Sequence, residues 1–348
     1  MDRQLAMNSM NQKGISLVVC CHNSAERLPA TVQHLTRQEI PADVAWEVLI
    51  VDNASTDGTS DVALQCWMDS GRHGRHFRIV AENKLGIGPA RYRGIREAKY
   101  DTICFIDDDN WVDNEYLKLA YEFMMAHPDV AACGSLNEAT SDGSLPGWFE
   151  TFQRSFAVGP QSEEAGDVTD KRGVLWSAGI VLRKSALDEL MRAGFEPLVS
   201  GAQGESSLLR SEDYELCLAL KLRGWKIWYE PNLKLKHFMP AGRLDWMYLR
   251  KLLNGVGQSD AKLLPYFYAQ NKAYRVPRLA WLRLLLRTAG KIIPRSHKFL
   301  LMRSRRFEGD PDILEIERSA GLIKSVLQQR SYFDVQAARI VNASWIKR

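Results

Sequence analysis

The stretch TICFIDDDNW, residues 102–111, joins an apolar run to three consecutive aspartates. The apolar run has the length of a strand and is continuous rather than alternating, which is typical of a parallel strand buried on both faces. The same pattern recurs in ISLVVCC (15–21), EVLIVD (47–52) and FRIVAE (77–82), and segments with helical spacing separate these runs. The alternation predicts an α/β fold with a mostly parallel sheet flanked by helices.

Polar residues stand where each predicted strand ends. They read HNS (22–24), DNASTDGT (52–59), ENKLGIG (82–88) and DDDN (107–110). Ligands of open parallel sheets bind beyond the carboxyl ends of the strands, so these segments form the candidate site. Three adjacent carboxylates repel one another, and Mg²⁺ or Mn²⁺ shared with substrate phosphates would offset that repulsion. A solvated loop before a helix explains the triplet equally well by itself.

Asp52 favours a ligand site over a solvated loop. It ends a predicted buried strand, where an unpaired carboxylate would be unfavourable. We therefore expect it to accept a hydrogen bond from a ligand or from a fixed backbone donor. The alternative is a turn that leads into a helix capped by Asp57 or Thr59.

The composition fits a globular chain without a disulfide framework. Of the 348 residues, 45% are hydrophobic and 25% are charged, and the length suggests one large domain with an appendage, or two domains. The six cysteines form no CxxC pair, so we expect them to be core residues in a reducing cytosol. The N-terminus lacks a signal-peptide pattern and no stretch has the length and apolarity of a membrane span, so we expect no bilayer crossing.

Six segments taken together resemble glycosyltransferase family 2, the inverting, nucleotide-sugar-dependent enzymes with the Rossmann-like GT-A fold. They are ISLVVCCHN (15–23), VLIVDNASTDGT (48–59), ENKLGIGPARYRGI (82–95), FIDDDNWVD (105–113), SAGIVLRKSAL (177–187) and SEDYELCLALKLRGWKIWYEPNLKLKH (211–237). The resemblance covers about residues 14–240, the expected catalytic domain. Residues 1–13 are expected to form a flexible N-terminus, and residues 241–348 a mainly helical extension.

The resemblance implies a nucleoside diphosphate sugar as donor, with UDP favoured and GDP and dTDP left open. Asp52 would contact the nucleotide base, with Asn53 beside it. The backbone around His22, Asn23 and Ser24 would form the other wall of the nucleoside pocket. The family's first strand usually ends in a turn like Pro-Thr-Tyr, whereas this chain has Cys21-His22, so we expect a differently shaped wall.

The resemblance places the aspartate triplet at the family's DxD motif. Asp109 would be the direct ligand of Mg²⁺ or Mn²⁺, Asp107 would reach the ribose or the metal, and Asp108 would share either role. His237 follows the segment LKLK, where related enzymes often have a histidine near the metal or the phosphates. A structural hydrogen-bonding histidine is the alternative.

Glu212 and Asp213 stand where the family places its catalytic base, and we expect Asp213 to fill that role. It would remove the proton of the acceptor hydroxyl as that oxygen attacks the anomeric carbon. Two acids in the first turn of a helix also stabilise the helix dipole, which is the simpler explanation. The expected acceptor is a saccharide or a lipid-linked saccharide in cell-surface polysaccharide or glycolipid assembly.

Four further positions match the family's donor site. Lys84 and Arg91 would face the diphosphate, or else lie on a solvated helix face. Trp176 and Gly179 would shape the cleft for the donor sugar and the acceptor, although Trp176 also suits a core. The QxxRW signature of processive members is absent, because KLRGW (221–225) has no matching glutamine, so we expect one sugar per encounter.

The segment 275–306 carries ten Lys and Arg residues and no Asp or Glu, while the rest of the chain has a net charge of −6 from 36 basic and 42 acidic residues. Arg283, Arg287 and Lys291 recur every four residues, so they share one helix face, and Leu279, Leu282, Leu285, Leu286 and Ala289 fall largely on another. Such a helix can lie in an anionic membrane interface. The alternative is a helix packed on the catalytic domain with its basic side in water.

We expect a cytoplasmic protein, with peripheral contact at the cytoplasmic membrane face if the helix lies in the membrane interface. We expect no nucleic-acid binding, because no nucleic-acid motif accompanies the charge.

Other function classes fit less well. A dinucleotide-dependent oxidoreductase needs GxGxxG after its first strand, and GIGPAR (86–91) follows a later strand and ends in Arg. A P-loop enzyme is excluded by the lack of GxxxxGK[ST]. A metal-dependent phosphohydrolase and a non-catalytic module that binds sugars or lipid head groups remain the alternatives.

Overall fold

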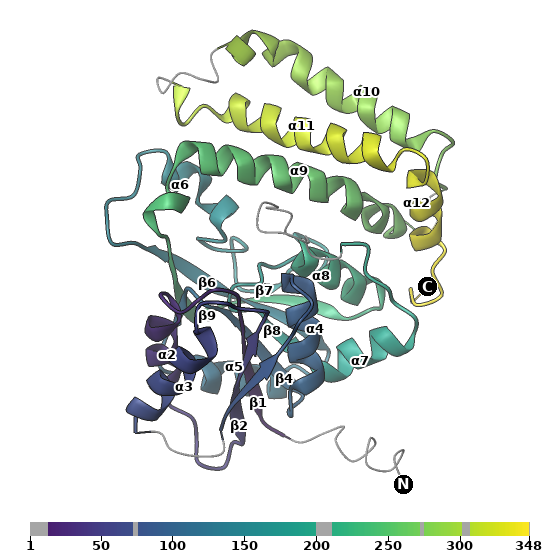
Figure 1. Ribbon diagram of the computed structural model, residues 1–348. Helices are drawn as coiled ribbons and strands as arrows, with labels where there is room; N and C mark the ends of the chain where they lie inside the picture. The colour runs from purple at the N-terminus through teal and green to yellow at the C-terminus, as the bar shows by residue number, and fades with distance from the viewer. Residues whose placement is uncertain (1–12, 72–75, 200–210, 272–274, 301–306, 348) are drawn as a thin grey trace. The chain divides into compact units, whose positions relative to one another are not determined.

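A computed structural model describes residues 13–71, 76–199, 211–271, 275–300 and 307–347, and these residues divide into two compact units (Figure 1). The first unit holds the described residues of Met1–Thr140, Ala157–Ala193 and Gly224–Phe238. The second holds those of Ser141–Phe156, Gly194–Arg223 and Met239–Arg348. The expected catalytic segment 14–240 therefore contributes to both units, and nearly all of the expected flexible N-terminus lies outside the described residues.

The first unit is built on one mixed sheet, in which nine strands of described residues follow the order β3-β2-β1-β4-β8-β6-β9-β5, with β7 paired to β9. The strands are β1 (Ile15–Cys21), β2 (Trp46–Asp52), β3 (Phe77–Ala81), β4 (Thr102–Asp107), β5 (Asn110–Val112), β6 (Val130–Thr140), β7 (Gly166–Asp167), β8 (Val181–Arg183) and β9 (Lys226–Phe238). The four predicted strands pair in parallel, as expected. β8 runs antiparallel to β4 and β6, and β5 runs antiparallel to β9.

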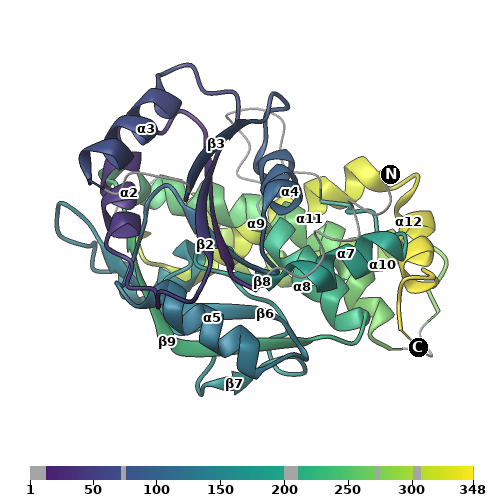
Figure 2. The same cartoon turned by 90° about the horizontal axis from the view of Figure 1, so that it is seen from below.

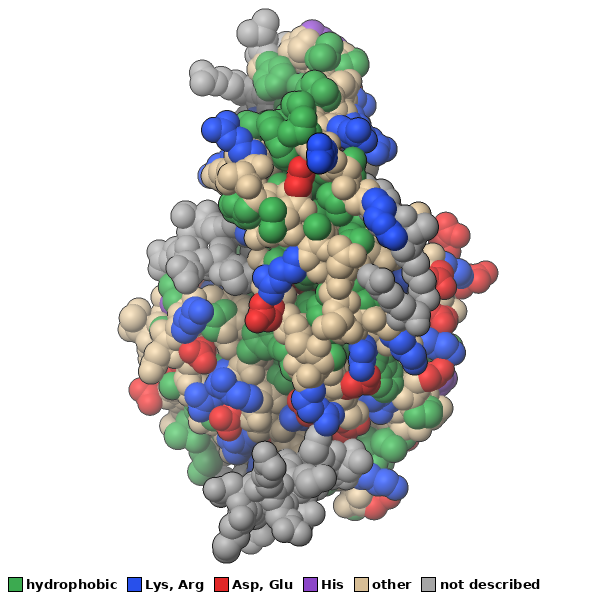
Figure 3. Space-filling view, turned by 90° about the vertical axis from the view of Figure 1, so that its right-hand side faces the viewer, with side chains coloured by type: hydrophobic (Ala, Val, Ile, Leu, Met, Phe, Trp, Pro, Cys, Tyr) green, Lys and Arg blue, Asp and Glu red, His purple; other side chains and the backbone are tan. Residues whose placement is uncertain are grey.

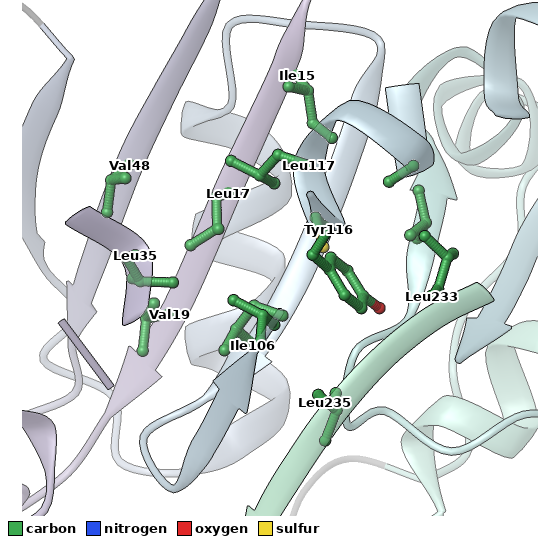
Figure 4. Close-up of a cluster of buried hydrophobic side chains, with 14 of the residues drawn as sticks. Ile15, Leu17, Val19, Leu35, Val48, Ile106, Tyr116, Leu117, Leu233 and Leu235 are labelled. Atoms are coloured by element: carbon green, nitrogen blue, oxygen red, sulfur yellow. The ribbon is translucent and has the colours of Figure 1, made fainter. Parts of the chain in front are cut away.

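Helices cover both faces of this sheet, which explains the continuous apolar runs (Figure 2). They are α2 (Leu28–Thr36), α3 (Thr59–Asp69), α4 (Ile87–Glu97), α5 (Tyr116–Ala126) and α7 (Lys184–Arg192). Leu17 and Val19 of β1 join one core with Leu35 of α2 and Tyr116 of α5 (Figure 4). Val18 points the other way and meets α4 at Gly94, where an added Cβ would lie 2.6 Å from its methyl group.

The second unit is mainly helical, as predicted for residues 241–348. Its elements are α6 (Phe149–Phe152), η1 (Gln153–Phe156), α8 (Glu212–Leu222), η2 (Ala241–Arg243), α9 (Trp246–Ala269), α10 (Ala280–Ile292), η3 (Ile293–Leu300), α11 (Pro311–Gln329) and α12 (Phe333–Val341). Asp245 caps α9 by accepting hydrogen bonds from the N–H groups of Met247 and Tyr248. Among the described residues, no helix is both long enough and apolar enough to span a bilayer.

The six cysteines are free thiols, and four of them are fully buried: Cys21, Cys104, Cys133 and Cys217. Cys20 and Cys66 are half-buried. The expectation of core residues without a disulfide framework is thus confirmed for those four positions.

Candidate functional site

The carboxyl ends of three parallel strands bring the first two predicted acids to one edge of the sheet. Asp52 pairs in register with Cys21, and Asp107 pairs with Cys20. The two carboxylates therefore flank the end of β1, where the sequence predicted a ligand site.

The carboxylate of Asp52 is held by the turn that follows it. One oxygen accepts a hydrogen bond from the Ser55 N–H at 3.1 Å, and the other accepts one from the Ser60 hydroxyl. Partial burial alone would raise the pKa of Asp52, but these hydrogen bonds outweigh it and hold the pKa below its ordinary value. Asp52 is therefore an ionised, oriented acceptor, and the fixed backbone donor expected from the sequence is Ser55.

Asn53 and His22 tie together the loops that follow β1, β2 and β3. The buried Asn53 amide donates to the carbonyls of Glu82 and Lys84 at 3.0 and 2.8 Å, and its oxygen accepts from Gly86 N–H at 2.8 Å. His22 Nδ1 lies 2.7 Å from the Asn53 carbonyl, so it carries the proton and donates. The Asn53 side chain thus fixes the shape of the predicted nucleoside wall from within.

Asn23 connects the same wall to the turn after β2. Its backbone has a left-handed φ of 48°, and its N–H donates to the Ser55 hydroxyl at 3.1 Å. Its side-chain oxygen accepts from Thr56 N–H at 2.8 Å. A strained conformation held by several partners on another loop is typical of a functional site.

Asp108, the middle aspartate of the triplet, points toward the start of α2. Its carboxylate lies 2.6 Å from the Arg27 guanidinium and accepts a hydrogen bond from the Ser24 hydroxyl. Burial and the neighbouring charge of Asp109 raise the pKa of Asp108, while Arg27 and Ser24 stabilise its charged form. Arg27 was not predicted as a partner of Asp108, because nothing in the local sequence signals a partner 81 residues away.

Asp109 and His237 lie together, because β5 and β9 pair Asn110 with His237. His237 Nε2 is 3.4 Å from an Asp109 oxygen, and both side chains are almost fully buried. Asn110 donates to the same oxygen at 3.0 Å. The sequence predicted this neighbourhood from two motifs that are 128 residues apart in the chain.

The donors of this neighbourhood fit a metal that also binds substrate. Within the described ranges, no three His, Cys, Asp or Glu side chains converge as a complete metal cage. Mg²⁺ and Mn²⁺ usually take only one or two protein carboxylates and complete their shell with phosphates and water. Asp109 and His237 are the two neighbouring side chains here that could hold such an ion.

Arg91 reaches the first aspartate of the triplet from α4. Its guanidinium lies 3.8 Å from an Asp107 oxygen, and its side chain is only 16% exposed, so it does not lie on a solvated helix face. Lys84 is different, because its side chain is exposed and its main chain serves the loop through Asn53 and Glu82. The structure therefore brings Arg91, but not the Lys84 side chain, to the triplet by a direct contact.

Trp176 and Gly179 lie inside the first unit. Trp176 is buried, its ring is covered by the Arg172 guanidinium at 4.4 Å, and its backbone N–H donates to the side-chain oxygen of Gln161. A Cβ added at Gly179 would come within 2.4 Å of Leu235 and 2.7 Å of the Tyr116 hydroxyl. Both positions therefore have packing roles, which was the alternative considered for Trp176.

Glu212 and Asp213 begin α8 in the second unit, and both are half-buried. Asp213 accepts a hydrogen bond from Tyr214 N–H at 2.8 Å, and Glu212 accepts one from Ser211 N–H at 3.2 Å. The other Glu212 oxygen is buried and accepts no hydrogen bond from the part of the chain that the structure describes.

Glu215 anchors the start of α8 and was not predicted. Its buried carboxylate accepts hydrogen bonds from the Tyr266 hydroxyl and from the N–H groups of Leu198 and Val199. Burial raises its pKa, although these hydrogen bonds oppose the shift. The sequence did contain a signal for Glu215, which lies on the same helix face as two buried leucines, Leu218 and Leu222. A carboxylate in such a place needs buried hydrogen-bond donors.

Comparisons with known proteins agree with this architecture. The family described as "Glycosyl transferase family 2" matches residues 16–191, just over half of the 348-residue chain. EpsH of Bacillus subtilis is 25% identical over 38% of this chain and 37% of its own length. A poly-beta-1,6-N-acetyl-D-glucosamine synthase of Staphylococcus epidermidis is 22% identical over 73% of this chain and 55% of its own length. The chain thus spans about half or less of the curated relatives that it matches.

A solved structure shares the fold. It is S. aureus TarS 1-349 in complex with UDP-GlcNAc, with a TM-score of 0.51, 16% identity and coverage of 95% of this chain and 91% of that one. At 16% identity, this likeness shows a shared fold and no more.

Proposed function

Because this chain belongs to glycosyltransferase family 2, we propose that it transfers one sugar from a nucleoside diphosphate sugar to an acceptor hydroxyl, with inversion at the anomeric carbon. The observation that carries the proposal is the meeting of Asp52 and Asp107 at the end of β1, followed two residues later by the Asp109–His237 pair. This order along one edge suits a pocket for the nucleotide base followed by a site for the diphosphate.

The donor end of the site recognises the nucleotide through fixed, ionised groups. Asp52 is ionised and oriented, so it accepts hydrogen bonds from the N–H groups of a base. His22 and Asn23 line the other wall, and Asn53 acts by holding the loops in place. A UDP-sugar is the favoured donor, which the UDP-GlcNAc complex of TarS supports.

The diphosphate is neutralised from two sides. Arg91, beside Asp107, supplies a fixed positive charge. Asp109 and His237 would hold Mn²⁺ or Mg²⁺, which supplies positive charge for the departing phosphate oxygens. Asp108 keeps this strand end in place through its ion pair with Arg27.

Asp213 acts as the base. Its carboxylate takes the proton of the acceptor hydroxyl while that oxygen forms the bond to the anomeric carbon, and the bond to the diphosphate breaks on the opposite face. Glu215 positions this helix start through Tyr266. The acceptor is a saccharide or a lipid-linked saccharide of a cell-surface polysaccharide or glycolipid, which the synthase relative supports, and the site of action is the cytoplasm or the cytoplasmic face of the membrane.

The test separates binding from transfer. Asp213→Asn should keep metal-dependent stabilisation by a UDP-sugar but lose transfer by about 10²–10⁴-fold. Glu212→Gln is the matched control and should keep most of the activity. If Glu212→Gln loses transfer while Asp213→Asn keeps it, the catalytic base is Glu212 and not Asp213. Donor binding without turnover in the native protein would indicate a binding module, and release of phosphate from simple phosphomonoesters would indicate a phosphohydrolase.

A further inference from the structure

Helix α10 leaves part of its apolar face in solvent. Its inner side is buried at Ala280 and Thr288, and its start is tied to α12, since Asp334 accepts hydrogen bonds from Leu279 N–H at 2.9 Å and Trp281 N–H at 3.4 Å. The outer side nevertheless exposes large apolar side chains. Leu279 is 51% exposed, Leu286 65% and Ile293 69%.

Two of these residues form one row. Leu286 and Ile293 are seven residues apart, which returns to the same side of a helix every two turns, and Ile293, the C-cap residue, keeps a helical backbone. Leu279 precedes the first turn with a left-handed φ of 58°, so it lies beside this row and not in it. Figure 3 shows hydrophobic side chains gathered at the top of the view, where the C-terminal helices lie, with Lys and Arg on both sides of them. A helix that simply packed its apolar face inward would bury this row, so that alternative does not account for the exposure.

A basic row runs beside the apolar one. Arg283, Arg287 and Lys291 are four residues apart and all three are exposed, with Lys291 also 3.4 Å from Glu315 on α11. The sequence has no Asp or Glu between residues 275 and 300. The outer side of α10 thus combines an apolar row with a row of positive charge.

We propose that this α10 face, made of Leu286 and Ile293 with Arg283, Arg287 and Lys291, docks in the interface of an anionic lipid bilayer. Apolar side chains enter the boundary between head groups and acyl chains while the basic row contacts the anionic head groups. In this proposal α10 lies along the membrane surface. The helix has 13 residues and is too short to cross the bilayer, because a span needs about 20.

Charge argues against a second copy of this chain as the occupant. Two copies meeting through the same face would bring both basic rows together without an acidic residue of α10 to pair with them. Nucleic acid would use the basic row but would gain nothing from an exposed row of leucine and isoleucine. An anionic lipid surface satisfies both rows at once.

The experiment measures binding of the full chain to vesicles of phosphatidylcholine with and without phosphatidylglycerol, by flotation. The native protein should bind only the anionic vesicles, and high salt should weaken this binding. Leu286→Asp with Ile293→Asp should lower the partition by at least about tenfold. Arg283→Gln with Arg287→Gln should lower it by about thirtyfold, from about 1 kcal/mol per basic residue.

The matched control is Leu64→Asp on α3, where the leucine is 49% exposed without a basic row. It should bind as the native protein does. Equal binding to neutral vesicles, equal loss in the control, or full binding by the α10 variants would overturn the proposal. A native dimer that Leu286→Asp converts to a monomer would instead make this face an interface between copies. The readout uses neither donor nor acceptor, so a failure of glycosyl transfer leaves it unaffected.

Discussion

Replacing Gly257 by alanine tests how the second unit is held together. Alanine favours a helix interior over glycine by about 1 kcal/mol, so the exchange should stabilise α9 if neighbours did not matter. The close crossing of α9 with α11 should reverse this gain and make the alanine variant less stable. A Cβ at Gly257 would lie 1.8 Å from the carbonyl oxygen of Arg318 and 3.0 Å from the backbone nitrogen of Leu322. Both are backbone atoms of α11, which cannot turn aside as a side chain can.

The magnitude follows from this distance. Real Cβ contacts do not come closer than 3.0 Å, so α9 and α11 would have to separate by at least 1.2 Å at Gly257. Gaps of about 0.5–1 Å already remove a quarter to a half of a van der Waals contact. Overpacking against backbone should cost about 3 kcal/mol, and the gain in propensity offsets about 1 kcal/mol, so the free energy of unfolding should fall by about 2 kcal/mol.

Urea unfolding followed by circular dichroism measures the change, and two variants control it. Gly290→Ala on α10 adds a Cβ with nothing within 4 Å, so it should stabilise by up to about 1 kcal/mol. Gly321→Ala meets the Asn254 carbonyl at 1.9 Å from the opposite helix. Because one separation relieves both clashes, the double variant should lose less than the sum of the two. A Gly257→Ala protein as stable as the native one would refute the close crossing.

Two further predictions concern the first unit. Asp109→Ala should lower metal-dependent release of UDP from a UDP-sugar by at least about a hundredfold while the melting temperature stays near native; normal turnover in this variant would rule out Asp109 as a ligand of the metal. Ser60→Ala removes a donor to the ionised Asp52, so the pKa of Asp52 should rise and the free energy of unfolding at neutral pH should fall by about 1 kcal/mol. The contribution of Asp52 is present above its unfolded pKa and is lost as pH falls through its lower folded pKa, so urea unfolding of the two proteins should converge in acid; a constant difference down to acidic pH would contradict this assignment.

The pattern of the sequence predicted the parallel strands of the sheet and placed the candidate site at their carboxyl ends. Four continuous apolar runs of strand length indicate strands buried on both faces, and their connection through helices indicates that they are parallel. The polar residues after them then meet at one edge as a consequence of topology. Asp52 and Asp107 were therefore predictable as neighbours of the end of β1, and the motif order indicated the family.

The individual roles of the site residues were decided by the tertiary structure. Three adjacent aspartates are equivalent in sequence, and Asp108 is set apart only because Arg27 approaches it from the start of α2. Arg91 likewise faces Asp107 because α4 packs beside β1. The sequence shows which groups are charged, but ion pairing depends on distances between segments that local periodicity does not encode.

The same limit applies to the C-terminal helices. Periodicity predicted an amphipathic α10 but left open whether its apolar side would be buried. The structure buries Ala280 and Thr288 and leaves Leu286 and Ile293 in solvent, because a single neighbouring layer covers only part of the helix circumference. The sequence fixes where apolar side chains lie around a helix, and only the packed neighbours decide which of them water still reaches.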